Sequence, residues 1–189
     1  MRFLCLHGMG TNSAIFAVQL GPVLSRLEDA GHEFTFVDGL MECNSTEEIR
    51  SVFPGPYLCY YNSPTSELVA AAFEYVHEII EEEGPFDGVI GFSQGAALAA
   101  SMLLQSAKQH KKPLFELAIF AGASLPFDID DESGLDEFYA SMRGTKIWDN
   151  MFDGDDAIDG PLGYPRHFDP DRKPLLARYH PDKAKKMHM

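Results

Sequence analysis

The chain has 189 residues, of which 45% are apolar, enough for one hydrophobic core and short for two, so we expect a single domain. Its 15 Lys and Arg residues against 29 Asp and Glu residues give a net charge of −14, which argues against nucleic-acid and membrane-surface partners. Three scattered cysteines (Cys5, Cys43 and Cys59) and an N-terminal apolar run too short for a signal peptide predict a cytoplasmic protein.

Strands and helices are expected to alternate along the first two thirds of the chain. Short apolar runs bounded by turn residues are typical of buried strands, and apolar residues recurring every three or four positions are typical of helices. We expect strands at residues 3–6, 34–37, 86–91 and 114–121, and helices at 13–30, 66–83 and 96–109. Gly21-Pro22 is expected to interrupt the first helix. The alternation predicts an α/β fold with a mostly parallel sheet and helices on both faces.

Residues 40–64 contain several Pro, Gly, Asn and Ser residues and predict a long loop of the kind that lines functional sites. Three tyrosines, Tyr57, Tyr60 and Tyr61, lie within it. Their rings either face a ligand or cover the core, and the sequence leaves both interpretations open.

The pattern changes after residue 127. Residues 128–160 are rich in acids, and residues 161–189 are rich in proline and then basic. Within a single domain over 1–189, we therefore expect residues 1–127 to form the clear α/β part and 128–189 a lid-like insertion or tail. This tail should pack more loosely, because such a composition buries little apolar surface.

The segment Gly91-Phe92-Ser93-Gln94-Gly95 predicts a nucleophile elbow. A serine hydroxyl is a weak nucleophile, so hydrolases hold it on a sharp strand-to-helix turn close to helix-terminal N–H groups. The expected strand precedes Ser93 and the expected helix follows it, and small residues two positions either side permit the close packing of such a turn. The alternative is a serine that only caps the helix.

Acyl transfer also requires N–H donors for the tetrahedral oxyanion. The first would be the N–H of Gln94, directly after Ser93. The second is expected in the glycine-containing loop His7-Gly8-Met9-Gly10, with Met9 N–H as the favoured donor. We interpret His7 as a histidine that holds this turn by a side-chain hydrogen bond rather than as a catalytic base.

Three segments of the chain stand out together, namely Leu6-His7-Gly8-Met9-Gly10-Thr11-Asn12-Ser13 followed by Phe16, Gly91-Phe92-Ser93-Gln94-Gly95-Ala96, and Ala123-Ser124-Leu125-Pro126-Phe127. They resemble the FSH-type serine hydrolase family, which includes fungal esterases and thioesterases of polyketide gene clusters. The resemblance covers about the first two thirds of the chain. It implies an α/β-hydrolase-like fold, Ser93 as the nucleophile, and an oxyanion hole from the Met9 and Gln94 N–H groups.

The sequence departs from this family where the triad acid and base are due. In the family, a strand after the lid-like insertion leads to the triad aspartate, and the histidine follows; neither is evident here. We therefore expect a truncated fold, incomplete at the C-terminus, with both residues unassigned and absent unless an unread exon encodes them. Chain order alone would allow substitutes, namely one of Asp149, Asp153, Asp155, Asp156 or Asp159 with His167 or His180, but no buried strand precedes these acids.

Other patterns predict no cofactor and no metal. Gly8-Met9-Gly10 followed by Asp38 imitates a dinucleotide-binding unit, but Ser13 stands where its third glycine belongs, so this remains a minor alternative. The acidic cluster at 149–159 lacks the ligand register of a calcium loop, and the seven histidines show no zinc spacing.

Two functional hypotheses follow. The first is a serine esterase or thioesterase of secondary metabolism, which needs no cofactor and acts on a small-molecule ester or thioester or on a carrier-bound polyketide. The second is a catalytically incomplete hydrolase-fold protein or acyl-ligand binder. If acid and base are absent, p-nitrophenyl esters should be hydrolysed only feebly, with little change in Ser93→Ala.

Overall fold

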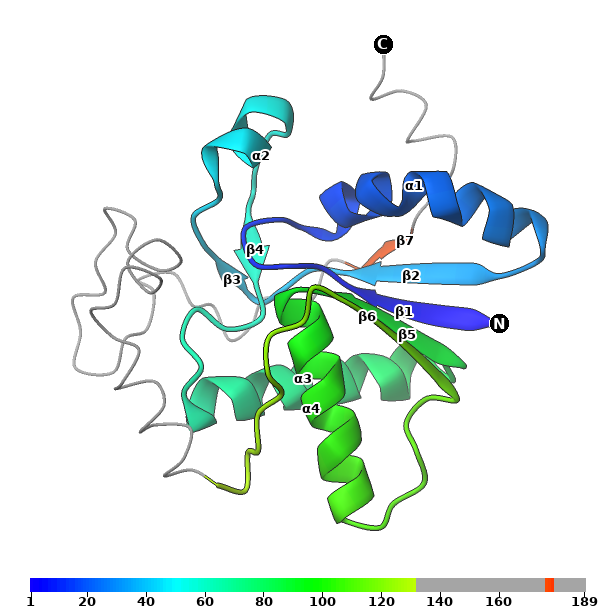
Figure 1. The fold of residues 1–189 in the computed structure, drawn as a ribbon, viewed down its shortest axis with the longest axis vertical. Coiled ribbons are helices and arrows are strands. Elements are labelled where there is room, and N and C mark those ends of the chain that lie inside the picture. The colour runs from blue at the N-terminus through cyan, green and yellow to red at the C-terminus, as the bar shows by residue number, and fades with distance from the viewer. Residues whose placement is uncertain (132–175, 179–189) are drawn as a thin grey trace.

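The computed structural model describes residues 1–131 and a strand at 176–178 (Figure 1). Its strands are β1 Arg2–Leu6, β2 Glu33–Val37, β3 Met41–Glu42, β4 Leu58–Cys59, β5 Gly88–Phe92, β6 Leu117–Ala121 and β7 Leu176–Arg178. Its helices are α1 Ser13–Asp29, α2 Glu47–Val52, α3 Ser66–Glu83 and α4 Gln94–Lys108. The predicted alternation of strands and helices is confirmed.

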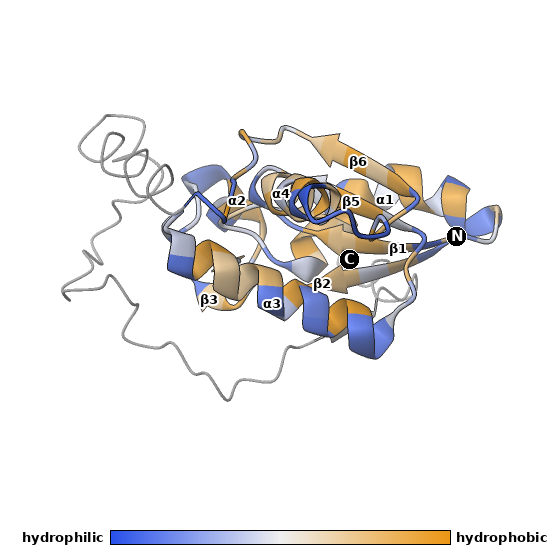
Figure 2. Cartoon of the chain, turned by 90° about the horizontal axis from the view of Figure 1, so that it is seen from below, coloured by the Kyte–Doolittle hydropathy of each residue, from blue (hydrophilic) through white to orange (hydrophobic). Residues whose placement is uncertain are grey.

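The main sheet has the strand order β6-β5-β1-β2-β7. Strand β1 pairs in parallel with β2 and β5, β5 pairs in parallel with β6, and β7 pairs antiparallel with β2. Helix α1 lies on one face, while α3 and α4 lie on the other (Figures 1 and 2). The expected α/β architecture, a mostly parallel sheet covered on both faces, is therefore present.

Strand β1 shows why this sheet needs helices on both faces. Successive side chains of a strand point to opposite faces. Leu4 and Leu6 belong to the core cluster with α3 and α4, whereas Phe3 and Cys5 pack with Phe16 of α1. A run of apolar residues without polar alternation is therefore what a central parallel strand requires.

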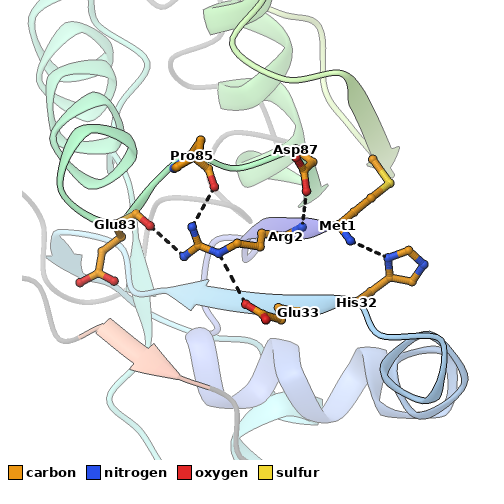
Figure 3. A network of polar contacts seen from close by, with 7 residues as sticks. All are labelled: Met1, Arg2, His32, Glu33, Glu83, Pro85 and Asp87. Carbon is orange, nitrogen blue, oxygen red and sulfur yellow. Dashed lines mark hydrogen bonds and ion pairs between the residues drawn. The ribbon is translucent and has the colours of Figure 1, made fainter.

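The start of β1 is fastened to the end of α3 by Arg2 (Figure 3). The Arg2 guanidinium donates to the carbonyl oxygens of Glu83 and Pro85 at 2.8 and 2.9 Å, and its backbone N–H donates to the Asp87 carboxylate at 2.7 Å. A longer ion pair of 3.5 Å joins it to the exposed Glu33 on β2. The contact with Glu83 O satisfies the carbonyl of the last residue of α3, at a helix C-terminus where the helix dipole also favours a cation.

Helix α1 differs from expectation in one respect. The interruption predicted at Gly21-Pro22 is wrong, because the helix runs unbroken through both residues. Pro22 is exposed, so water can replace the helical hydrogen bond that proline is unable to donate. The helix begins at a typical cap, where the Asn12 side chain accepts from Ile15 N–H at 2.8 Å.

Residues 40–64 are more ordered than the predicted long loop. They contain β3, the short α2 and β4, and β3 pairs antiparallel with β4. Tyr60 and Tyr61 are 1% and 3% exposed and belong to the core, while the partly buried Tyr57 donates its hydroxyl to Phe53 O at 2.7 Å. The sequence left open whether these rings face a ligand or cover the core, and Tyr60 and Tyr61 belong to the core.

The three cysteines carry free thiols. Cys5 and Cys59 are buried, and Cys43 is partly buried. Burial raises the pKa of Cys5, whereas hydrogen bonding with the Cys59 side chain and with the Gly10 backbone lowers the pKa of Cys43.

After β6, residues 122–131 return along α4. The Phe127 N–H donates to Ser101 Oγ at 2.7 Å, and Lys108 forms ion pairs with Asp128 and Asp130. Strand β7 was not expected from the sequence. The looser packing predicted for 128–189 stays a prediction, because most of that range lies outside the described residues. None of the described helices is long and apolar enough to cross a membrane.

Candidate active site

Ser93 occupies the turn between β5 and α4. Its backbone angles are φ 49° and ψ −113°, a left-handed conformation that a non-glycine residue adopts only under strain. The surroundings hold it there: Ser93 N–H donates to Ala121 O at 2.8 Å, and Ser93 O accepts from Ala97 N–H at 3.0 Å. The Ser93 side chain makes no capping hydrogen bond to α4, unlike the cap expected of a purely structural serine.

The two glycines of the segment are required by close packing. A Cβ on Gly91 would lie 2.6 Å from Ala96 N, and a Cβ on Gly95 would lie 2.6 Å from His7 O, with Leu6 O closer still. Real side chains do not tolerate such distances. Gly91 and Gly95 therefore let the first turn of α4 sit directly against the ends of β1 and β5.

The loop after β1 lies beside Ser93. A Cβ built on Gly8 would be 3.3 Å from Ser93 Cβ and 2.9 Å from the Phe92 ring, so only a glycine permits this approach without displacing Phe92. Gly10, at φ 76°, turns the loop toward α1. The expected neighbourhood of the His7-Gly8-Met9-Gly10 loop and the elbow is thus observed.

The backbone N–H groups of Gln94, which follows Ser93, and of Met9, which follows Gly8, have no hydrogen-bond partner among residues 1–131. By contrast, the adjacent Gly10 and Gly95 N–H groups donate to Leu58 O and His7 O. Gln94 N–H also lies at the N-terminus of α4, where the helix dipole favours negative charge. These are the two donors that the sequence proposed for an oxyanion.

His7 is fully buried and holds the loop by both ring nitrogens. Gly39 N–H donates to its Nε2 at 2.9 Å, so Nε2 carries no proton and Nδ1 is the donor, to Gly8 O at 2.7 Å. Burial lowers the His7 pKa to about 4, against smaller opposing effects of the Gly8 hydrogen bond and Asp38. With both nitrogens engaged, His7 is unsuited to act as a base for Ser93.

Sequence reasoning missed the part played by the Gln94 side chain. Its Oε1 accepts from Tyr60 N–H at 2.9 Å, and its Nε2 donates to Tyr61 O at 2.6 Å. Gln94 therefore ties the first residue of α4 to the segment after β4. Its partners lie 33 and 34 positions away in the chain, so no local pattern could have revealed the contact.

The triad acid and base are not found in the described part of the chain. The alternatives Asp149, Asp153, Asp155, Asp156, Asp159, His167 and His180 all lie outside the described residues. In residues 1–131 no histidine forms a hydrogen bond with Ser93: His7 is engaged as above, and His32 contacts the N-terminal amine. The structure thus shows Ser93 on a strand-to-helix turn, and the roles of Ser93, Met9 and Gln94 in a reaction stay predictions.

Asp38, the residue that suggested a dinucleotide site, has a structural contact. Its carboxylate accepts from Ser13 N–H at 2.8 Å at the start of α1, and its carbonyl accepts from the Tyr75 hydroxyl at 2.7 Å. Among the side chains that the structure describes, no three His, Cys, Asp or Glu residues gather as a metal site would require.

A serine on a strand-to-helix turn of a mostly parallel sheet covered by helices is typical of α/β-hydrolase-type proteins. A family model described as serine hydrolase (FSH1) matches residues 1–150. The chain belongs to this serine hydrolase family, which confirms the resemblance found in the sequence.

Named relatives are fungal. Over 158 residues the chain is 35% identical to esterase alnB of Emericella nidulans, covering 84% of this chain and 54% of the relative. Over 129 residues it is 40% identical to esterase FPY3 of Fusarium mangiferae, covering 67% of this chain and 59% of the relative. The chain therefore spans about half the length of the curated relatives it matches.

Among solved structures, a variant of tomato methylketone synthase I complexed with beta-ketoheptanoate is similar at a TM-score of 0.43. The sequence identity is 12%, and the match covers 92% of this chain and 54% of that one. A similarity of this size supports no further argument.

Proposed function

We propose that this protein is a serine hydrolase that cleaves a carboxylic ester or thioester through Ser93. The observation that carries the proposal is the strained Ser93 backbone at φ 49° between β5 and α4, with Gly8 of the loop after β1 packed close to Ser93. Membership of the serine hydrolase family and the names of the esterase relatives support it.

In the proposed reaction, Ser93 Oγ attacks the acyl carbon while a base takes its proton. The carbonyl oxygen becomes an oxyanion that accepts hydrogen bonds from Met9 N–H and Gln94 N–H. The intermediate collapses and expels an alcohol or a thiol, and water then releases the acid from the acyl-enzyme. The N-terminus of α4 adds a favourable field at the developing charge.

The base of this reaction comes from outside the described residues. Within the chain, the candidates are His167 and His180, each paired with one of the aspartates between 149 and 159. A positioned base is needed because a serine hydroxyl stays protonated at neutral pH. Labelling His167→Ala and His180→Ala variants alongside the wild type would show which of them, if either, activates Ser93.

The substrate class follows from the resemblance to fungal esterases and thioesterases. We place the activity in the cytoplasm and in secondary metabolism, with a small-molecule ester or thioester, or a carrier-bound polyketide, as the substrate. Rates on a p-nitrophenyl ester and on a thioester of the same acyl group would separate the two leaving groups.

The proposal is tested by labelling with a fluorophosphonate probe, which reacts with activated serines. We expect a covalent adduct on Ser93 in the wild type and none in Ser93→Ala. Ser106→Ala is the matched control, because it removes a buried serine hydroxyl at the far end of α4, where Ser106 Oγ donates to Lys112 O at 3.2 Å. This control should label like the wild type.

Absence of labelling in the wild type would contradict the hydrolase proposal. It would favour the second hypothesis, an acyl-ligand binder of the same fold. One observation keeps this hypothesis in view: across residues 1–131 no histidine contacts the Ser93 hydroxyl through a hydrogen bond. Saturable binding of an acyl ligand without turnover would then identify the binder.

A further inference from the structure

The carbonyl oxygen of Gly8 accepts three hydrogen bonds. His7 Nδ1 donates at 2.7 Å, Thr11 Oγ1 donates at 2.7 Å, and Thr11 N–H donates at 3.3 Å. A carbonyl oxygen has two lone pairs, so this one is more than saturated. Two of the three donors are side chains, and both side chains are buried.

This carbonyl belongs to the same peptide unit as Met9 N–H. Because the peptide is planar and trans, the N–H bond points opposite to the C=O bond. Whatever fixes the direction of Gly8 C=O therefore fixes the direction of Met9 N–H, which is unused in the described part of the protein. Hydrogen bonds accepted by the carbonyl also polarise the peptide and make its N–H a stronger donor.

The first donor, His7, is itself held in place. Gly39 N–H donates to Nε2 at 2.9 Å, which leaves the proton on Nδ1, and the ring packs against Tyr60 with the ring centres 5.0 Å apart. Burial lowers the His7 pKa to about 4, so the ring is neutral at pH 7 and keeps this arrangement.

The second donor, Thr11, is pinned by its backbone. Leu58 N–H donates to Thr11 O at 2.7 Å, and the neighbouring Gly10 N–H donates to Leu58 O at 3.0 Å. Thr11 is only 5% exposed, so its hydroxyl has no competing water shell. The distance of 2.7 Å from the Thr11 hydroxyl to Gly8 O is that of a strong neutral hydrogen bond.

We propose that Thr11 and His7 are positioning residues for the oxyanion hole. By donating hydrogen bonds to Gly8 O, they orient Met9 N–H toward the substrate oxygen. This inference rests on the proposed function and names residues that touch neither substrate nor Ser93. The hydroxyl of Thr11 acts through one peptide plane, so its removal should reduce transition-state stabilisation and leave ground-state binding unchanged.

The test uses the full chain and the variants Thr11→Val, Thr11→Ser and Ser106→Ala. Thr11→Val keeps the shape and removes the hydroxyl, Thr11→Ser restores a hydroxyl, and Ser106→Ala removes a buried hydroxyl elsewhere. The first readout is the residual dipolar coupling of the Met9 N–H bond in isotopically labelled protein, which reports the orientation of that bond without any chemistry. The second is the kinetics of fluorophosphonate labelling of Ser93.

We expect Thr11→Val to change the Met9 coupling and to lower the maximal labelling rate constant about tenfold, with the half-saturating probe concentration within about twofold of the wild type. Thr11→Ser should restore both quantities, and Ser106→Ala should alter neither. A folded Thr11→Val protein with an unchanged Met9 coupling would overturn the proposal, and so would a changed coupling with an unchanged labelling rate. Circular dichroism of each variant verifies folding, and if Thr11→Val does not fold, a Thr11→Ala comparison against Thr11→Ser decides by the same readouts.

Failure of the proposed function has a different signature. If the wild type and Ser93→Ala label alike, Ser93 is not activated, and the hydrolase proposal falls. The Met9 coupling then decides the positioning role alone: a change in Thr11→Val that Thr11→Ser reverses supports it, and no change overturns it.

Discussion

At the scale of single residues, His7 shows how a titratable side chain can serve a site without reacting in it. Its Nε2 must remain unprotonated to accept from Gly39 N–H, and its Nδ1 must remain protonated to donate to Gly8 O. A second proton would place two N–H donors face to face at Nε2 and would bury a positive charge. The structure therefore favours the neutral ring, which agrees with the lowering of the His7 pKa to about 4.

This shift predicts a pH dependence of stability. The folded-state pKa of about 4 lies below the value of 6.5 expected when unfolded, so between these limits the unfolded chain binds more protons. Above pH 6.5 the ring is neutral in both states, and as the pH falls from 6.5 to 4 the free energy of unfolding should drop by up to about 3 kcal/mol from this group. Urea denaturation at several pH values measures the slope.

His7→Asn is the informative variant for this slope. The asparagine amide can still donate to Gly8 O but does not titrate, so the curve below pH 6.5 should flatten even if the protein is less stable overall. The same change at the exposed His110 is the control and should leave the slope as in the wild type. Equal slopes for His7→Asn and the wild type would show that the ring is protonated without cost.

The sequence also predicted the strand-to-helix turn at Ser93 and the loop that lies beside it. Gly91 to Gly95 could be interpreted because an elbow is a local structure, set by five consecutive residues between a strand and a helix. The hydrogen bonds between Gln94 and Tyr60 and between Gly39 and His7 could not be predicted, because they join distant parts of the chain. Sequence spacing carries no information about such pairs until the sheet order is known.

At the scale of elements, too, structure set by local sequence could be predicted, and structure set by long-range contacts could not. Helices α1, α3 and α4 were predicted closely because each is long and carries a continuous apolar stripe. Strands β3 and β4 have two residues each and gain their pairing from each other and from the bridge between Thr11 and Leu58. Such short strands have no periodicity to detect, which is why residues 40–64 were predicted as a loop.

The contact of α4 with β1 gives a second prediction. Gly95→Ala should lower the free energy of unfolding by about 3 kcal/mol, because the new methyl group would collide with the carbonyl oxygens of Leu6 and His7, which are backbone atoms unable to move aside. Fluorophosphonate labelling of Ser93 should fall with it, since α4 carries Gln94 N–H. Urea denaturation and labelling of the same preparation check both effects.

Gly21→Ala is the matched control for this substitution. Gly21 lies inside α1, and apart from its chain neighbours and the backbone of α1 itself nothing lies within 4 Å of a Cβ built there. Alanine gains helix propensity, but its Cβ meets the ring of the following Pro22, so the two effects oppose each other and the free energy of unfolding should change by less than about 1 kcal/mol. If Gly95→Ala proved as harmless as Gly21→Ala, the tight packing of the elbow against β1 would be refuted.

At the scale of the whole molecule, β6 is an edge strand of the sheet among the described residues, and it carries exposed apolar side chains. Strand β6, which Figure 2 colours as hydrophobic, pairs with β5 on one side, and its residues Leu117, Ile119 and Phe120 are each 42–44% exposed. Among the described helices, α1 packs mainly on β2 and β1, whereas α4 packs on β6 from the other face of the sheet. An exposed apolar edge strand is a template for pairing with another chain.

The net charge of −14 opposes such pairing, because two copies repel each other over distances set by salt. We therefore predict that self-association rises with ionic strength: raising salt from about 0.01 M to 1 M shortens the Debye length from about 30 Å to about 3 Å and leaves the attraction between apolar edges. Sedimentation velocity at the two salt concentrations measures the change in association.

Ile119→Lys should abolish the salt-induced association, because it places a charge in the middle of β6. Val52→Lys, at a residue 69% exposed on α2, makes the same chemical change away from the sheet and should associate like the wild type. Equal association of Ile119→Lys and Val52→Lys would mean that β6 is not the contact, and a fall in association with salt would mean that charge attraction, rather than apolar pairing, joins the copies.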